Sequence, residues 1–406
     1  MRLSSSRSIE YLGFALAHFL GVLYLLMIPY AVSKQGDFVH LWIGGRAVVL
    51  GGGASLYDPA THLAILQSTG YSLSLFWAAS NDVLGAFYYP PTAVLWYGFL
   101  ALFPLVTAQA IQASITWILV IMCGALISEI SAKRISTSWA IALLFLSPAV
   151  FDSFALGQNG VMTLSIVLLS LWLERKGKFC SAGIALSALV YKPNWLLAFG
   201  WYPLVRANFR HAIGIMLGAA AIITASALVV GLEPFSRFFA LLRPLWSLHE
   251  FSGYSATTQF SVAALYRVLF LNPTVALGAF VLTALLGLAV SAYALRRLPP
   301  SRACSGLAAA LLLATASLVN PHVHHYDLVL SWAAFVLTLA CAKECLKLHH
   351  KVTFSLIAAW GLSFYTGIVG GVPLVSVAMV LSVFALALSL LQQRPTGRAP
   401  CPHGAD

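Results

Sequence analysis

Long apolar segments constrain this chain more than any other feature of its sequence. Six of them are long enough to cross a bilayer: residues 11–32, 108–130, 212–231, 274–295, 352–369 and 372–391. A helix of about 20 apolar residues spans the hydrocarbon core. Because lipid offers no hydrogen-bond partner to backbone amides and carbonyls, such segments must form helices. We therefore expect an all-α, polytopic transmembrane helical bundle.

Composition excludes the main alternatives to a membrane protein. The chain is 60% hydrophobic and only 9% charged, whereas a soluble domain has about 25% charged residues. A soluble enzyme, a disordered chain and a nucleic-acid-binding domain all need far more polar surface. These three classes are therefore excluded.

Shorter apolar runs complete the expected bundle. They occupy residues 139–150, 161–173, 303–319 and 328–342. The segment 180–205 is also apolar, but Tyr191-Lys192-Pro193-Asn194 interrupts it. Proline removes a backbone donor and ends a helix, so we expect two short helices there. The sequence thus predicts about 12 spans in a single membrane domain, residues 1–391.

Charge is distributed unevenly between the two sides of this bundle. The segments on one side hold 17 of the 23 Lys and Arg residues: 1–10, 129–138, 174–178, 206–211, 296–302, 343–351 and 392–406. The other side holds seven of the 12 Asp and Glu residues. The positive-inside rule places the basic side in the cytoplasm. The net charge of +11 then faces anionic lipid rather than nucleic acid.

Two long segments lie on the acidic, outer side. The first covers residues 33–107 and includes juxtamembrane helices, among them a shallow helix within 91–106. The second covers residues 232–273. Long loops on one face of a scaffold often carry function. The polar, proline-containing tail 392–406 is expected to be a disordered cytoplasmic segment.

Acids and amides on the outer side are candidates for chemistry. Asp37 follows the first span, where its carboxylate could accept a proton from a hydroxyl or cap the next helix. Asp58 precedes Pro59, so we expect a helix cap. Gln158 and Asn159 could bind sugar hydroxyls or form a capping turn. Asp152 could supply a second acid beside them.

Lys192 and a histidine cluster are the strongest cationic candidates. A lysine at membrane depth is costly, so Lys192 could bind a lipid phosphate or extend to the headgroups. The densest polar cluster is Asn320-Pro321-His322-Val323-His324-His325-Tyr326-Asp327. Its side chains could bind a transition metal, bind phosphate, tune a proton transfer, or form a polar turn without a role.

The order of these motifs is informative. It runs Gly36-Asp37-Phe38, Leu56-Tyr57-Asp58-Pro59, Tyr89-Pro90-Pro91-Thr92, Gly157-Gln158-Asn159, Lys192-Pro193 and Pro321-His322-Val323-His324-His325-Tyr326-Asp327. This series resembles the family 87 glycosyltransferases of the GT-C superfamily. The resemblance implies a GT-C type fold and a mannosyltransferase that depends on polyprenyl-phosphate mannose. It further implies a multi-pass protein of the bacterial inner membrane with its active site on the extracytoplasmic face.

The resemblance also implies roles for single residues. Asp37 matches the catalytic acid of the first loop, and His322 lies where a histidine is expected near the reaction centre. Lys192, His324 and His325 would bind the donor phosphate. Gln158, Asn159, Tyr326 and Asp327 would bind substrate.

Elementary chemistry agrees with this assignment. An acceptor hydroxyl needs a general base, which Asp37 can supply. The departing phosphate needs donors or positive charge rather than a general acid. We therefore expect inversion by direct displacement, no metal and no cofactor beyond the donor substrate. The expected partners are membrane lipid, a polyprenyl-phosphate-linked sugar and a glycolipid or glycan acceptor. A transporter or flippase for a lipid-linked sugar is the alternative.

Overall fold

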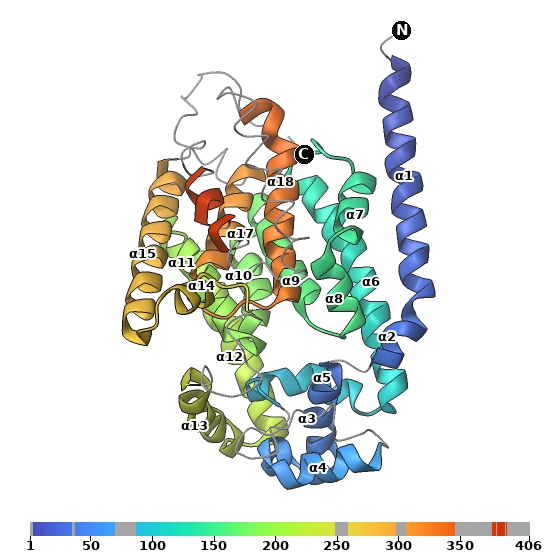
Figure 1. The fold of residues 1–406 in the computed structure, drawn as a ribbon, viewed down its shortest axis with the longest axis vertical. Coiled ribbons are helices and arrows are strands. Elements are labelled where there is room, and N and C mark those ends of the chain that lie inside the picture. The colour runs from blue at the N-terminus through green and yellow to red at the C-terminus, as the bar shows by residue number, and fades with distance from the viewer. Residues whose placement is uncertain are drawn as a thin grey trace.

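Helices are the only regular secondary structure among the described residues. The computed structural model describes residues 3–34, 37–69, 87–247, 259–297, 306–345, 376–378, 380–385 and 387 (Figure 1). Within these ranges there are α-helices and short 3₁₀-helices but no strands. The expected all-α fold is therefore confirmed.

The first half of the chain contains both long and short helices. They are α1 (Leu3–Leu26), α2 (Ile28–Lys34), α3 (Phe38–Gly51), η1 (Gly53–Tyr57), α4 (Pro59–Ser68), η3 (Pro91–Ala93), α5 (Val94–Leu100), α6 (Leu105–Ile130), α7 (Thr137–Phe145), α8 (Pro148–Ala155) and α9 (Gly160–Arg175). The expected shallow helix within 91–106 corresponds to η3 and α5, which lead directly into α6.

The second half continues the bundle. Its helices are α10 (Phe179–Ser187), η4 (Ala188–Tyr191), α11 (Pro193–Val205), α12 (Phe209–Val230), α13 (Glu233–Ser247), α14 (Val262–Leu269), α15 (Pro273–Arg297), α17 (Gly306–Val319), η7 (His325–Leu328) and α18 (Val329–Cys345). The predicted break inside 180–205 is present, because Lys192 leaves the helical conformation and Pro193 begins α11.

Among the described residues, four helices are long and apolar enough to cross a membrane. They are the Ser8–Leu26 part of α1, together with α6, α12 and α15. Helices α7 and α8 meet at 67° and could form a fifth, broken span. The number of about 12 spans is therefore not confirmed and stays a prediction. The predicted span 352–369, most of 372–391 and the tail 392–406 lie outside the described residues.

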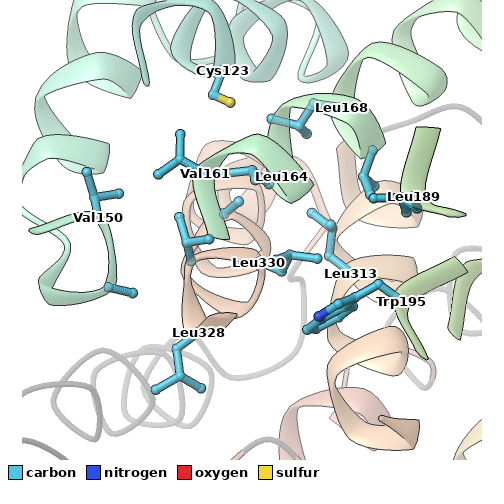
Figure 2. Close-up of a cluster of buried hydrophobic side chains, with 14 of the residues drawn as sticks. Cys123, Val150, Val161, Leu164, Leu168, Leu189, Trp195, Leu313, Leu328 and Leu330 are labelled. Atoms are coloured by element: carbon cyan, nitrogen blue, oxygen red, sulfur yellow. The ribbon is translucent and has the colours of Figure 1, made fainter. Parts of the chain in front are cut away.

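The core of the bundle surrounds α9. Figure 2 shows Val161, Leu164 and Leu168 of α9 among side chains from α6, α8, α11, α17 and α18. All three are essentially buried, as is the large ring of Trp195 on α11. Apolar residues therefore cover α9 on several faces, which is the pattern of a central rather than a peripheral helix.

A separate group of helices closes one end of the bundle. Helices α3, η1, α4, α5 and α13, here called the end lobe, lie together below the bundle in Figure 1. The end lobe is anchored near the start of α6, where Trp42 Nε1 donates to the Phe103 carbonyl at 3.1 Å. Asp58 caps α4 by accepting the Thr61 amide at 3.0 Å, which confirms its predicted role. The Thr61 hydroxyl also donates to Asp58, and this hydrogen bond, followed by that of the Thr61 amide, lowers the pKa of Asp58.

The opposite end of the bundle is basic. There Arg175 donates to the Ile130 carbonyl at 2.8 Å, and Arg206 donates to the Leu295 carbonyl at 2.7 Å. Asp37 and Asp58, by contrast, belong to the end-lobe side. The tertiary structure thus keeps the charge separation that the sequence predicts.

Close backbone contact joins α10 to α12. A Cβ atom added at Gly183 would collide with the His211 carbonyl, and one added at Gly214 would collide with the Cys180 carbonyl. Small residues let membrane helices approach this closely. The two helices therefore pack backbone to backbone at this crossing.

Gly214→Ala is expected to lower the thermal unfolding midpoint in detergent, because its methyl group would push against a backbone carbonyl. Overpacking of this kind costs about 1–3 kcal/mol. The matched control is Gly278→Ala in α15, where no atom lies within 4 Å of the added Cβ. That change should be neutral or stabilising by up to about 1 kcal/mol. Equal midpoints for the two variants would contradict the tight crossing.

Candidate functional site

Asp37 stands at the junction between the end lobe and the bundle. It precedes α3, yet its side chain makes no capping hydrogen bond. Instead, Oδ2 accepts Nε2–H of Gln158 at 2.8 Å. The partly exposed carboxylate is thus oriented by an amide from the α8–α9 turn. The cap that the sequence also allowed is absent at this residue.

The backbone around this contact is equally well defined. The Phe38 amide donates to the Leu156 carbonyl at 3.0 Å. Gly157 has φ of 65°, and a Cβ atom there would lie 2.6 Å from Cβ of Phe38. Only glycine fits such a left-handed position under a close neighbour without strain. The turn 156–158 is therefore docked onto the first turn of α3.

A buried ion pair forms the second part of the site. Lys192 Nζ lies 2.5 Å from Oδ1 of Asp327, and the two side chains are 8% and 0% exposed. The ammonium also donates to Oδ1 of Asn159 at 3.0 Å and lies 5.1 Å from the ring centre of Tyr326. An ammonium has three N–H donors, and Asp327 and Asn159 are the two acceptors that bind Lys192 among the described residues.

Asn159 connects the ion pair to two tyrosines. Its Nδ2 donates to the hydroxyl of Tyr89 at 2.8 Å and to that of Tyr97 at 3.1 Å. The Tyr89 ring stacks on Tyr191 at 6.5 Å. The side-chain amide of Asn159 therefore bonds to other protein groups and links the start of α9 to Tyr97 of α5.

The histidine cluster forms an ordered turn between α17 and α18. The Asn320 carboxamide oxygen accepts the His322 amide at 3.0 Å. Oδ2 of Asp327 accepts the His324 amide at 3.3 Å, while its other oxygen holds Lys192. Nε2 of His322 and Nε2 of His324 are 2.9 Å apart, so one of them carries the hydrogen.

Burial fixes the charge state of His324. Desolvation, and next the Lys192 charge, hold its pKa well below the usual value of 6.5. His324 is therefore neutral at pH 7 and can serve a phosphate only as a neutral hydrogen-bond donor. Burial likewise lowers the pKa of His40, one turn after Asp37, although the Asp37 carboxylate opposes this effect.

The structure brings together most of the residues predicted from sequence. Lys192, Asn159, Tyr326 and Asp327 form one connected network, and His322 and His324 adjoin it. Asp37 and Gln158 form a neighbouring pair. His325 pairs instead with Asp152, Nε2 to Oδ2 at 3.8 Å. Within the described ranges, no group of three His, Cys, Asp or Glu side chains converges as a metal-binding set.

Sequence reasoning assigned no role to several residues of the network. Tyr89 and Tyr97 hold Asn159, while Asn194 donates to Asn320 at 3.2 Å. Tyr89 and Asn194 do stand within the notable stretches Tyr88-Tyr89-Pro90-Pro91 and Tyr191-Lys192-Pro193-Asn194. Tyr97 lies in an ordinary apolar helix, and no sequence signal distinguishes it.

Comparison with known proteins identifies the family. The model of glycosyltransferase family 87 matches residues 87–321, which is more than half of the chain. The chain belongs to glycosyltransferase family 87. No curated protein and no solved structure matched the chain.

Membership makes this chain a membrane glycosyltransferase and confirms the resemblance seen in the sequence. The matched region includes Gln158, Asn159 and Lys192 but stops before His322 and begins after Asp37. The roles of Asp37 and the histidine turn therefore depend on the geometry described above.

Lys192→Met is expected to destabilise the fold by about 3–5 kcal/mol, because it leaves Asp327 charged and buried without a partner. The double variant Lys192→Met/Asp327→Asn removes both charges and keeps an oxygen to accept the His324 amide. It should therefore be more stable than the single variant. Denaturant unfolding in detergent measures both. A double variant no more stable than Lys192→Met would show that the two side chains are not coupled.

Proposed function

We propose that this enzyme transfers a hexose, mannose, from a polyprenyl-phosphate donor to an acceptor hydroxyl on the extracytoplasmic side of the bacterial inner membrane. The carrying observation is Asp37, a partly exposed carboxylate oriented by Gln158 at the bundle end opposite the basic loops. The acceptor is a glycolipid or glycan, and the enzyme needs no metal or further cofactor.

The reaction is a direct displacement with inversion. Asp37 Oδ1 accepts the proton of the acceptor hydroxyl while Oδ2 stays bound to Gln158. The acceptor oxygen bonds to C1 of the sugar as the bond from C1 to the phosphate oxygen breaks. The electron pair leaves with the polyprenyl phosphate, whose low pKa makes protonation unnecessary.

We assign stabilisation of the departing phosphate to Lys192 and the histidine turn. Among the described residues, Asp327 and Asn159 take two of the three N–H donors of Lys192, and we assign the third to a phosphate oxygen. The histidine turn lies beside it, where His322 and His324 share a hydrogen bond between their Nε2 atoms, and we assign the phosphate contact to this turn. We place His322 at the reaction centre. Gln158 acts by orienting Asp37 and does not bind the sugar itself. Fixed donors of this kind favour developing negative charge without reorganisation.

The location of the site supports the assigned side of the membrane. Arg175 and Arg206 mark the basic end of the bundle, which the positive-inside rule places in the cytoplasm. Asp37 then faces outward, where lipid-linked rather than nucleotide-linked sugars are the available donors. A flippase for a lipid-linked sugar is the competing function.

Asp37→Asn is expected to lower kcat by about 10²–10⁴-fold, because the amide cannot accept the proton. The KM for the donor should stay unchanged. The assay incubates purified protein with polyprenyl-phosphate mannose and candidate acceptors and detects product by mass spectrometry. Asp58→Asn is the matched control, since Asp58 only caps α4. Unchanged turnover in Asp37→Asn, or lipid movement without sugar transfer, would refute the proposed function.

Gln158→Ala should reduce kcat less than Asp37→Asn does, because the base remains but loses the amide that orients it. A reduction of about tenfold matches the loss of one hydrogen bond to a charged group. Steady-state kinetics with both substrates measure the effect. A rise in donor KM with constant kcat would instead indicate that Gln158 binds the sugar directly.

A further inference from the structure

The acid–imidazole pair Asp152–His325 is distinct from both the Asp37–Gln158 contact and the Lys192–Asp327 network. We infer that this pair binds the hydroxyl groups of the acceptor sugar and so forms the acceptor side of the site. The inference rests on the proposed function and adds to it the residues that select a neutral, hydroxyl-bearing acceptor.

Accessibility distinguishes this pair from the buried one. The side chains of Asp152 and His325 are 27% and 36% exposed, against 8% and 0% for Lys192 and Asp327. Their polar atoms are 3.8 Å apart, which is longer than a hydrogen bond. The two groups are therefore near each other without a direct hydrogen bond between them. A ligand hydroxyl placed between them can bond to both at once.

The backbone beneath the pair is closely packed. A Cβ atom added at Gly160 would collide with the Tyr326 carbonyl and lie 2.8 Å from Oγ of Ser153. Helix α8 and the η7 turn therefore pack tightly on either side of the first residue of α9. Since Asp152 belongs to α8 and His325 to η7, their separation is set by this packing. A binding pair fixed in this way loses little entropy when it takes a ligand.

Two aromatic rings lie beside His325. Its imidazole meets Tyr326 edge-on at 5.2 Å and Phe260 at 6.5 Å. Ligand sites commonly combine aromatic walls with a few polar groups that fix orientation. A sugar ring presents the matching combination of C–H surface and hydroxyls.

The charge of Asp152 favours the acceptor over the phosphate-bearing donor as the ligand of this pair. A carboxylate repels the phosphate of the donor but accepts hydrogen bonds from hydroxyls. The cation, Lys192, lies in the neighbouring network. Asp37 and Asp152 also share one structural unit: the Leu156 amide bonds back to the Asp152 carbonyl, and the Leu156 carbonyl holds Phe38. Leu156, which follows α8, therefore links Asp152 to the start of α3 beside Asp37.

The test compares Asp152→Asn and His325→Gln with the wild-type protein, using polyprenyl-phosphate mannose as donor and octyl α-mannoside as acceptor. Each variant should raise the acceptor KM about tenfold, the loss expected for one hydrogen bond to a charged group. The donor KM should change by less than about twofold, since the pair makes no contact with phosphate. Asp58→Asn again serves as the control for loss of an acid on the end-lobe side.

Saturation-transfer NMR with octyl α-mannoside alone gives a second readout that needs no turnover. The wild-type protein should show transfer to the mannoside, and both variants should show it weakened. An unchanged acceptor KM with unchanged NMR signals, or a donor KM that rises instead, overturns the inference while the proposed function stands. A wild-type protein that binds the mannoside but transfers no sugar refutes the proposed function and leaves the pair as a binding site.

Discussion

The Lys192–Asp327 ion pair is the interaction on which the rest of the site depends. Both charges are buried, so neither could remain there without the other. Asp327 uses its two oxygens for different elements, one for Lys192 before α11 and one for the His324 amide before α18. Asn159 then extends the network to Tyr89 and Tyr97. One pair thus sets the positions of the histidine turn and the tyrosines.

The site uses different residues for positioning and for the proposed contacts with substrate. The buried groups hold the site together. Lys192 and Asp327 position each other through their ion pair. The groups to which we assign substrate contact are partly exposed: Asp37 is held by one amide, and Asp152 lies 3.8 Å from His325. Precise sites are generally built in this manner, with reactive side chains positioned by a second layer of packed and hydrogen-bonded groups.

Much of this molecule could be predicted from its sequence. Hydropathy and charge are local properties of the chain, so apolar runs predicted α6, α12 and α15, and basic segments predicted one end of the bundle. The Asp58 cap and the break at Pro193 also followed, because each depends only on neighbouring residues. The total number of spans did not follow, since several apolar helices are too short for length alone to decide whether they cross.

By itself the sequence determined that the chain forms membrane helices, has one basic end, and carries a set of polar motifs in a particular order. Only the tertiary structure decided how those motifs pair. Gln158 meets Asp37 across 121 residues, and Lys192 meets Asp327 across 135 residues. Such contacts are set by how helices pack rather than by any local preference. For this reason the pairing of Lys192 with Asp327 could not be predicted from the sequence.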